Sequence, residues 1–142
     1  SGYRPFENMI NMDYDPITYP DVVRDVNRGF PFEENRFKEI YTSHVIEHID
    51  DVFYFMAEIW RVTKDKGKVI IIAPYCGFLD WAIQPDHKRF ISYDYFVRWK
   101  PSHQSVQNEK KQLLGAEFKT IKIELINEGR EIKVELEVVK DV

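Results

Sequence analysis

The stretch that decides the fold is residues 30–75, which read FPFEENRFKEIYTSHVIEHIDDVFYFMAEIWRVTKDKGKVIIIAPY. Phe37–Ser43 predicts a strand, and the apolar residues of Val52–Val62 recur at helical spacing, which places one face of a helix in the core. Lys68–Ala73 is a nearly continuous β-branched run, typical of a strand buried on both faces. Strand, helix and strand joined by short connections form a βαβ unit, so the two strands are expected to be parallel.

Polar residues mark the boundaries of these elements. Asp50 or Asp51 is expected to cap the start of the helix, and Lys64–Gly67 to end it, with the glycine supplying the turn. Ser43-His44 stands where the first strand ends. Because ligands of open α/β sheets bind outside the carboxyl ends of the strands, the sequence predicts a site at this dipeptide.

The segments on either side add further elements. Met9–Asp13 and Asp21–Val26 each predict a short strand. Tyr93–Trp99 and Ser105–Leu114 each predict a helix, the second ending at Gly115.

Two strictly alternating runs close the chain. Ile121–Leu125 and Ile132–Val138, joined by Asn127–Arg130, predict an antiparallel β-hairpin with one solvated face. We therefore expect residues 1–142 to form a single α/β domain with a Rossmann-like mixed sheet. Its core strands would be parallel, its C-terminal hairpin antiparallel, and its helices would lie on both faces.

The composition is that of an ordinary soluble globular protein. A net charge of −4 argues against a nucleic-acid backbone as the main partner, since phosphate contacts need a basic face. Cys76 is the single cysteine, which excludes an intrachain disulfide and fits a reducing compartment, so we expect a cytoplasmic protein. No apolar run approaches membrane-spanning length, so no membrane partner is expected.

Several motifs resemble those of class I S-adenosylmethionine (SAM)-dependent methyltransferases of the small type 11 family, from Gly2 to about Val139. The family pattern LPF-x-x-x-x-F-D-x-(I/V)-x-x-S-x-V-x-E-H-(I/V) is matched by Phe30-Pro31-Phe32, Phe37 and Ser43-His44-Val45-Ile46-Glu47-His48-Ile49. The family's E-x-x-R-V-L-K-P-G-G is matched by Glu58-Ile59-Trp60-Arg61-Val62-Thr63-Lys64-Asp65-Lys66-Gly67, without the proline and one glycine. We expect these two changes to alter only the turn. A D-P-x-H-x-x-x-F segment that recurs in part of the family is matched by Gln84-Pro85-Asp86-His87-Lys88-Arg89-Phe90.

The resemblance implies SAM as the cofactor and assigns residues to it. Asp13 matches the acid that accepts hydrogen bonds from the ribose hydroxyls. Asp25-Val26 matches the dipeptide that holds the adenine through a side-chain acceptor and a backbone amide. Ser43 and His44 match the strand end under the methionine part, and Gly2 falls in the glycine loop.

The implied activity is methyl transfer to an acceptor that the sequence does not identify. Since the sulfonium is already an activated donor, the protein's main task is to hold donor and acceptor in line. If a general base is used, His44 and His87 are the candidates, because histidine titrates near neutrality. The rival hypothesis is an inactive methyltransferase-like module that binds a partner or forms an oligomer, and a homo-oligomer is open under either hypothesis.

The chain departs from the family pattern at its start. The family opens with a strand and a glycine loop, whereas this sequence begins at Ser1-Gly2, as if inside that loop. Three explanations are a fragment, a cloning remnant, or a fold without the strand, and we expect the fragment. The domain would then be incomplete at its N-terminus and would bind SAM weakly or not at all. Without the usually central strand, Met9–Asp13 would be unpaired or paired abnormally.

Each assigned residue also has a plainer interpretation. Asp13 would simply end a strand, and Asp25 would pair with a neighbouring arginine on the surface. Glu47-His48 would start a helix, where the dipole favours the acid, and we prefer this to catalysis. His44 would pack at the end of its strand.

A metal site is a further hypothesis for the histidines of this chain. Asp86 and His87, together with His44 or His48, would suggest one, but no short metal-ligand spacing supports it. The sequence therefore predicts no metal.

Overall fold

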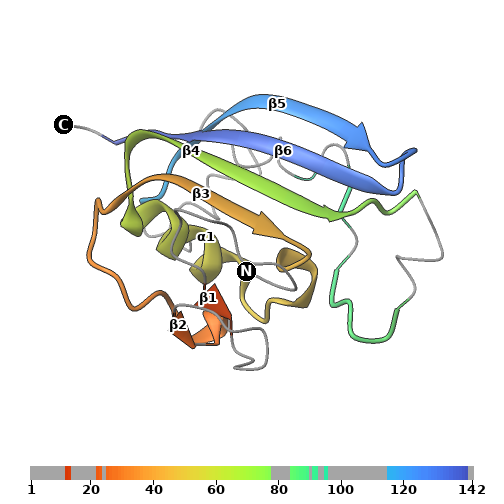
Figure 1. Ribbon diagram of the computed structural model, residues 1–142, viewed down its shortest axis with the longest axis horizontal. Helices are drawn as coiled ribbons and strands as arrows, with labels where there is room; N and C mark the ends of the chain where they lie inside the picture. The colour runs from red at the N-terminus through yellow and green to blue at the C-terminus, as the bar shows by residue number, and fades with distance from the viewer. Residues whose placement is uncertain are drawn as a thin grey trace.

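A four-stranded mixed sheet forms the centre of the computed structural model, which describes residues 12–13, 22–23, 25–77, 84–89, 91–92, 95 and 115–140 (Figure 1). The strands are β3 (Phe37–Ser43), β4 (Thr63–Pro74), β5 (Phe118–Ile126) and β6 (Glu131–Val138), in the order β3-β4-β6-β5. β3 and β4 are parallel, and β6 is antiparallel to both β4 and β5. The predicted parallel core and C-terminal hairpin are thus confirmed.

Helix α1 (Val52–Val62) connects β3 to β4 and buries the predicted apolar face. Asp51 is its N-cap, and its side chain accepts hydrogen bonds from the amides of Phe53 and Tyr54. Central strand β4 is buried from residue 69 to residue 74 except for half-buried Ile70, as expected of a strand covered on both faces. No helix within the described ranges is long and apolar enough to span a membrane.

The turn between α1 and β4 differs from the prediction. β4 begins at Thr63, directly after the helix, so residues 64–67 already belong to the strand. The residue with left-handed backbone is Lys66, at φ 62°, and not Gly67. Gly67 is required for space instead, because a Cβ there would lie 2.8 Å from the carbonyl oxygen of Lys64.

A second, two-stranded parallel sheet contains β1 (Met12–Asp13) and β2 (Val22–Val23). The described part of Met9–Asp13 is therefore paired, but in a sheet separate from the four-stranded one. The strand predicted over Asp21–Val26 was too long. Asp25 accepts a hydrogen bond from the Asn27 amide, which starts the short 3-10 helix η2 (Val26–Arg28) instead of extending the strand.

The outer hairpin strand also corrects the predicted pattern. The register of β5 against β6 shifts between Thr120 and Lys122, so the alternation is interrupted at Ile121. Ile121 is 47% exposed and Leu125 43% exposed, whereas the β6 residues Ile132 and Val134 are fully buried. The predicted helices at Tyr93–Trp99 and Ser105–Leu114 lie outside the described residues, apart from Tyr95.

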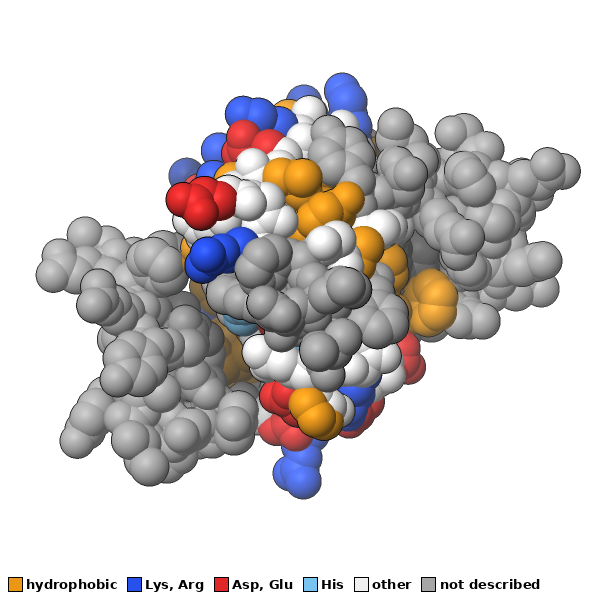
Figure 2. Space-filling model, turned by 90° about the vertical axis from the view of Figure 1, so that its right-hand side faces the viewer, with side chains coloured by type: hydrophobic (Ala, Val, Ile, Leu, Met, Phe, Trp, Pro, Cys, Tyr) orange, Lys and Arg blue, Asp and Glu red, His pale blue; other side chains and the backbone are white. Residues whose placement is uncertain are grey.

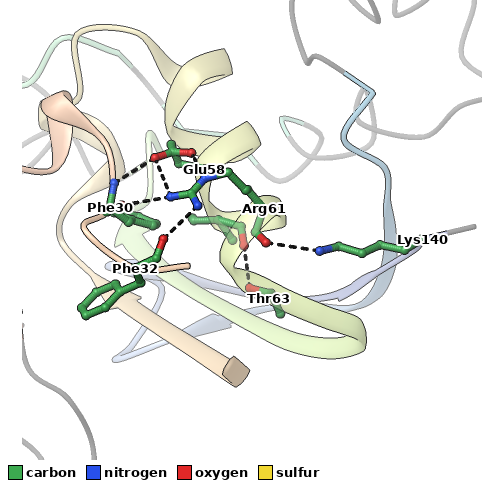
Figure 3. Close-up of polar contacts among 7 residues, drawn as sticks. Phe30, Phe32, Glu58, Arg61, Thr63 and Lys140 are labelled. Carbon is green, nitrogen blue, oxygen red and sulfur yellow. Dashed lines mark hydrogen bonds and ion pairs between the residues drawn. The ribbon is translucent and has the colours of Figure 1, made fainter. Parts of the chain in front are cut away.

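Glu58 and Arg61 join α1 to the segment that precedes β3 (Figure 3). The Arg61 guanidinium donates to the carbonyl oxygens of Phe30 at 2.9 Å and Phe32 at 2.8 Å, and to both Glu58 oxygens. Glu58 in turn accepts from the Phe30 amide at 3.0 Å. Hydrogen bonding to Glu58 raises the pKa of Arg61, so the group that holds this segment stays charged.

Candidate functional site

The carboxyl ends of β3 and β4 meet the start of β6 at one edge of the sheet. Ser43 ends β3 and Pro74 ends β4, where it pairs with Glu131, the first residue of β6. A short 3-10 helix, η3 (Ile46–His48), follows β3 directly. The segment 84–89 lies beyond these strand ends (Figure 1). This is the edge at which the sequence predicts a ligand site.

His44 is held at the end of β3 by its backbone and by two carboxylates. Its amide donates to the carbonyl of Ile72 at 2.8 Å, and its backbone has a left-handed φ of 56°. Its Nε2 lies 2.5 Å from Oε2 of Glu131, a side chain that also accepts a hydrogen bond from Asn127. Its Nδ1 lies 3.6 Å from Oε1 of Glu47. The ring is thus oriented between two acids and is not merely packed at a strand end.

Glu47 is the most deeply buried charged side chain of this edge, at 1% exposure. Its neighbour Ile46 is completely buried and anchors η3 in the core, which draws the glutamate inward. Within the described residues, neither of its carboxylate oxygens accepts a hydrogen bond. Burial raises the pKa of the Glu47 carboxyl, although nearby histidines act in the opposite direction. Glu47 stands in the first turn of η3, as expected of an acid that starts a helix, and its side chain is buried in addition.

The segment 84–89 covers η3 through main-chain contacts. The Lys88 amide donates to the Glu47 carbonyl at 2.7 Å, and the Arg89 guanidinium donates to the Ile46 carbonyl at 2.5 Å. His87 is thereby brought beside His48, with ring centroids 4.8 Å apart and nearly perpendicular. Figure 2 looks onto this end of the molecule and shows histidine atoms beside a basic side chain.

Three metal-ligating side chains converge at this point. One ligand atom each from Glu47, His48 and His87 lies within 4.8 Å of the others. His48 Nε2 is 3.6 Å from Glu47 Oε1, and its Nδ1 is 3.1 Å from the main-chain carbonyl oxygen of Asp86. The Asp86 carboxylate lies 3.5 Å from the same nitrogen.

The structure thus gathers two of the predicted residues, His44 and His87, around Glu47, which was not predicted to have a chemical role. The signal for Glu47 was present in the S-H-V-I-E-H motif, whose acid is adjacent to a histidine. For Glu131 no sequence signal existed, because it stands in an alternating strand among other solvated acids. It reaches the site only because β6 runs antiparallel to β4.

The residues assigned to the cofactor are placed only in part. Asp25 is exposed and uses one oxygen to cap η2, with the Val26 amide beside it, while Ser43 is half-buried at the end of β3. The Asp50 amide donates to the Asn27 side chain, which joins η2 to the segment between η3 and α1. The backbone of Asp13 ends β1, whereas its side chain lies outside the described part, as does Gly2.

Comparison with known families supports the resemblance. Residues 4–71 match the family model of the type 11 methyltransferases, described as a methyltransferase domain. The match covers the segments that contain Asp13, Asp25 and Ser43. A comparison with curated protein sequences found no match.

Solved structures share the fold. A SAM-dependent methyltransferase from Aquifex aeolicus is similar with a TM-score of 0.57 and 15% identity, over 83% of this chain and 54% of that one. A SAM-dependent methyltransferase from Mesorhizobium loti is similar with a TM-score of 0.57 and 12% identity, over 89% and 78%. The cyclase SpnF is similar with a TM-score of 0.59 and 10% identity, over 82% and 54%.

At these identities the likeness is one of fold, a Rossmann-like α/β fold, and the chain spans about half the length of the Aquifex protein. The presence of a cyclase among the similar structures shows that this fold carries more than one reaction.

Proposed function

We propose that the protein transfers a methyl group from SAM to an acceptor bound at the carboxyl edge of β3 and β4, because residues 4–71 match the family model of the type 11 methyltransferases. The observation that carries the proposal is the match of residues 4–71 to a methyltransferase domain. The matched range includes β3 and the polar residues that follow it, at the edge where ligands of open α/β sheets bind.

The described residues fit the cofactor. Asp25 is an exposed acceptor beside the Val26 amide, which suits an adenine with a donor and an acceptor on one edge. Ser43 supplies a hydroxyl at the strand end. SAM, when bound, would supply an activated methyl group on a sulfonium. The chain's own task is to hold the cofactor along this edge and to orient the acceptor against it.

We propose that the methyl acceptor binds beside His44 and His87. Both nitrogens of the His44 ring face carboxylates, so this side chain is better suited to positioning than to accepting a substrate proton. His87 stands on the covering segment, half-buried, and is the better candidate to contact the acceptor.

Calorimetry with SAM tests the proposal on the protein expressed from its complete gene. We expect saturable binding that Asp13→Ala weakens by about 1.5–3 kcal/mol, the scale of hydrogen bonds to a charged group. The melting temperature without ligand should barely change. Asp65→Ala is the matched control, because Asp65 lies at the opposite end of β4, where it accepts from the Lys140 amide.

Absence of SAM binding would contradict the proposal. A large loss of stability with unchanged SAM affinity in Asp13→Ala would assign that residue to the plain role of ending a strand.

A further inference from the structure

Glu47 is a buried carboxylate that the methyl-transfer proposal does not use. It is 1% exposed, and within the described residues neither of its oxygens accepts a hydrogen bond. Burial of a carboxylate is costly, and its own backbone amide and the nearby histidines offset only part of that cost, because the pKa of Glu47 stays raised. A bound cation would supply the missing compensation. What faces it is a set of imidazole rings and no lysine or arginine within ion-pair distance in the described part of the chain.

The tautomer of His48 follows from its surroundings. Its Nδ1 lies 3.1 Å from the main-chain oxygen of Asp86, and a carbonyl oxygen can only accept, so the ring proton belongs on Nδ1. In the neutral ring, Nε2 then presents a lone pair toward Glu47 Oε1, another acceptor, at 3.6 Å. His44 repeats this arrangement, with Nε2 toward Glu131 and Nδ1 3.6 Å from the same Glu47 oxygen.

The distance between His48 Nε2 and Glu47 Oε1 is longer than a hydrogen bond and leaves room for an ion between the two atoms. A charge-assisted hydrogen bond would bring nitrogen and oxygen to about 2.8 Å. Two ligands bound tetrahedrally to one ion at about 2.0–2.1 Å lie about 3.4 Å apart. The observed 3.6 Å between His48 Nε2 and Glu47 Oε1 is close to the second value.

We propose that Glu47, His48 and His87 form a binding site for a divalent transition-metal ion such as Zn²⁺. Their ligand atoms lie within 4.8 Å of one another, so a small closure of segment 84–89 completes the set. Two imidazoles and one carboxylate are a ligand set of catalytic zinc sites, and imidazole also suits iron, nickel and copper. The Asp86 carbonyl, bonded to the far nitrogen of His48, plays the orienting role that metal-bound histidines require.

The site departs from the expectation drawn from the sequence, and it does not rest on the proposed methyl transfer. Three protein ligands leave coordination positions open for water or for an oxygen of a substrate. With an ion bound, His87 would be a ligand and would not serve as a base.

Titration of the metal-free 142-residue chain with Co²⁺, followed by visible absorption, and with Zn²⁺, by competition with a chromophoric chelator, tests the site. We expect one ion per chain. Glu47→Gln and His87→Asn should each weaken binding at least about tenfold, since even loss of an orienting partner costs that much. Glu39→Gln, which removes an exposed acid from β3, should bind as the wild type does.

Thermal melts with and without Zn²⁺ separate a ligand from a merely structural residue. Glu47→Gln removes a buried charge that is only partly compensated, so the metal-free variant should melt no lower than the wild type, and Zn²⁺ should raise the melting temperature of the wild type only. Lack of saturable binding of either ion would overturn the proposal. So would Glu47→Gln and His87→Asn variants that stay folded by circular dichroism and bind with wild-type affinity.

Discussion

Arg61→Ala is predicted to cost far more stability than the loss of an ordinary surface arginine. The wild-type guanidinium donates to the carbonyls of Phe30 and Phe32 and to Glu58, which is only 13% exposed (Figure 3). A hydrogen bond to a charged group contributes about 1.5–3 kcal/mol. Because Arg61 itself is 36% exposed, we take the lower end for each carbonyl.

The two carbonyl bonds therefore amount to about 3 kcal/mol. Loss of the Glu58 pair adds to this cost, because Glu58 is largely buried and would lose its charged partner, so about 3 kcal/mol is the smaller estimate. For a chain of this size, a loss of 3 kcal/mol lowers the melting temperature by about 10 °C. Arg61→Lys should recover only part of the loss, because one ammonium cannot reproduce the fork that reaches both carbonyls.

Urea unfolding followed by circular dichroism measures the change in the free energy of unfolding. The comparison requires that the dependence of this free energy on urea concentration, the m-value, is the same in both proteins. The matched control is Arg36→Ala. Arg36 is also an arginine near this segment, but its side chain is exposed and, in the described part of the chain, stacks over the rings of Phe32 and Phe37 at 5.2 and 5.4 Å. That variant should lose no more than about 1 kcal/mol. If Arg61→Ala and Arg36→Ala lower the free energy of unfolding by the same amount, the hydrogen bonds of Arg61 contribute no more than the contacts of a surface arginine, and the reasoning fails.

Two further substitutions test local backbone features by the same unfolding assay. Lys66→Gly should stabilise the protein by about 0.5–1 kcal/mol, because relief of the left-handed φ of 62° outweighs the entropy cost of glycine, whereas Lys66→Ala should not. Gly29→Ala should cost about 2 kcal/mol or more, since Gly29 has a φ of 84° and its Cβ would meet Tyr54 and Glu58. Gly115→Ala, at φ 85° and with no described atom within 4 Å of its Cβ, serves as the comparison for the backbone cost, and equal losses would show that the crowding at Gly29 is unimportant.

Strand β3 and helix α1 were predicted to the residue, whereas β4 begins at Thr63, ahead of the predicted Lys68. β3 and α1 have the expected bounds because each carries its own information: a bounded apolar run for the strand, and helical spacing with a capping Asp51 for the helix. Because short connections join β3, α1 and β4, the two strands are expected to be parallel. In β5 the register shift at Ile121 interrupts the alternation. The side chains of Ile121 and Leu125 are therefore exposed, although the alternating pattern predicts that they are buried.

The chemistry at the sheet edge was decided by the tertiary structure. The sequence shows histidines and glutamates next to the end of a predicted strand at Ser43. Their position indicated where a ligand site should be. That Glu47 is buried, that His87 returns to it from about forty residues away, and that Glu131 holds His44 were not visible. Only His44 and Glu47 are close in the sequence, whereas His87 and Glu131 reach the edge on other segments. Only the packing of those elements brings their side chains within a few ångströms.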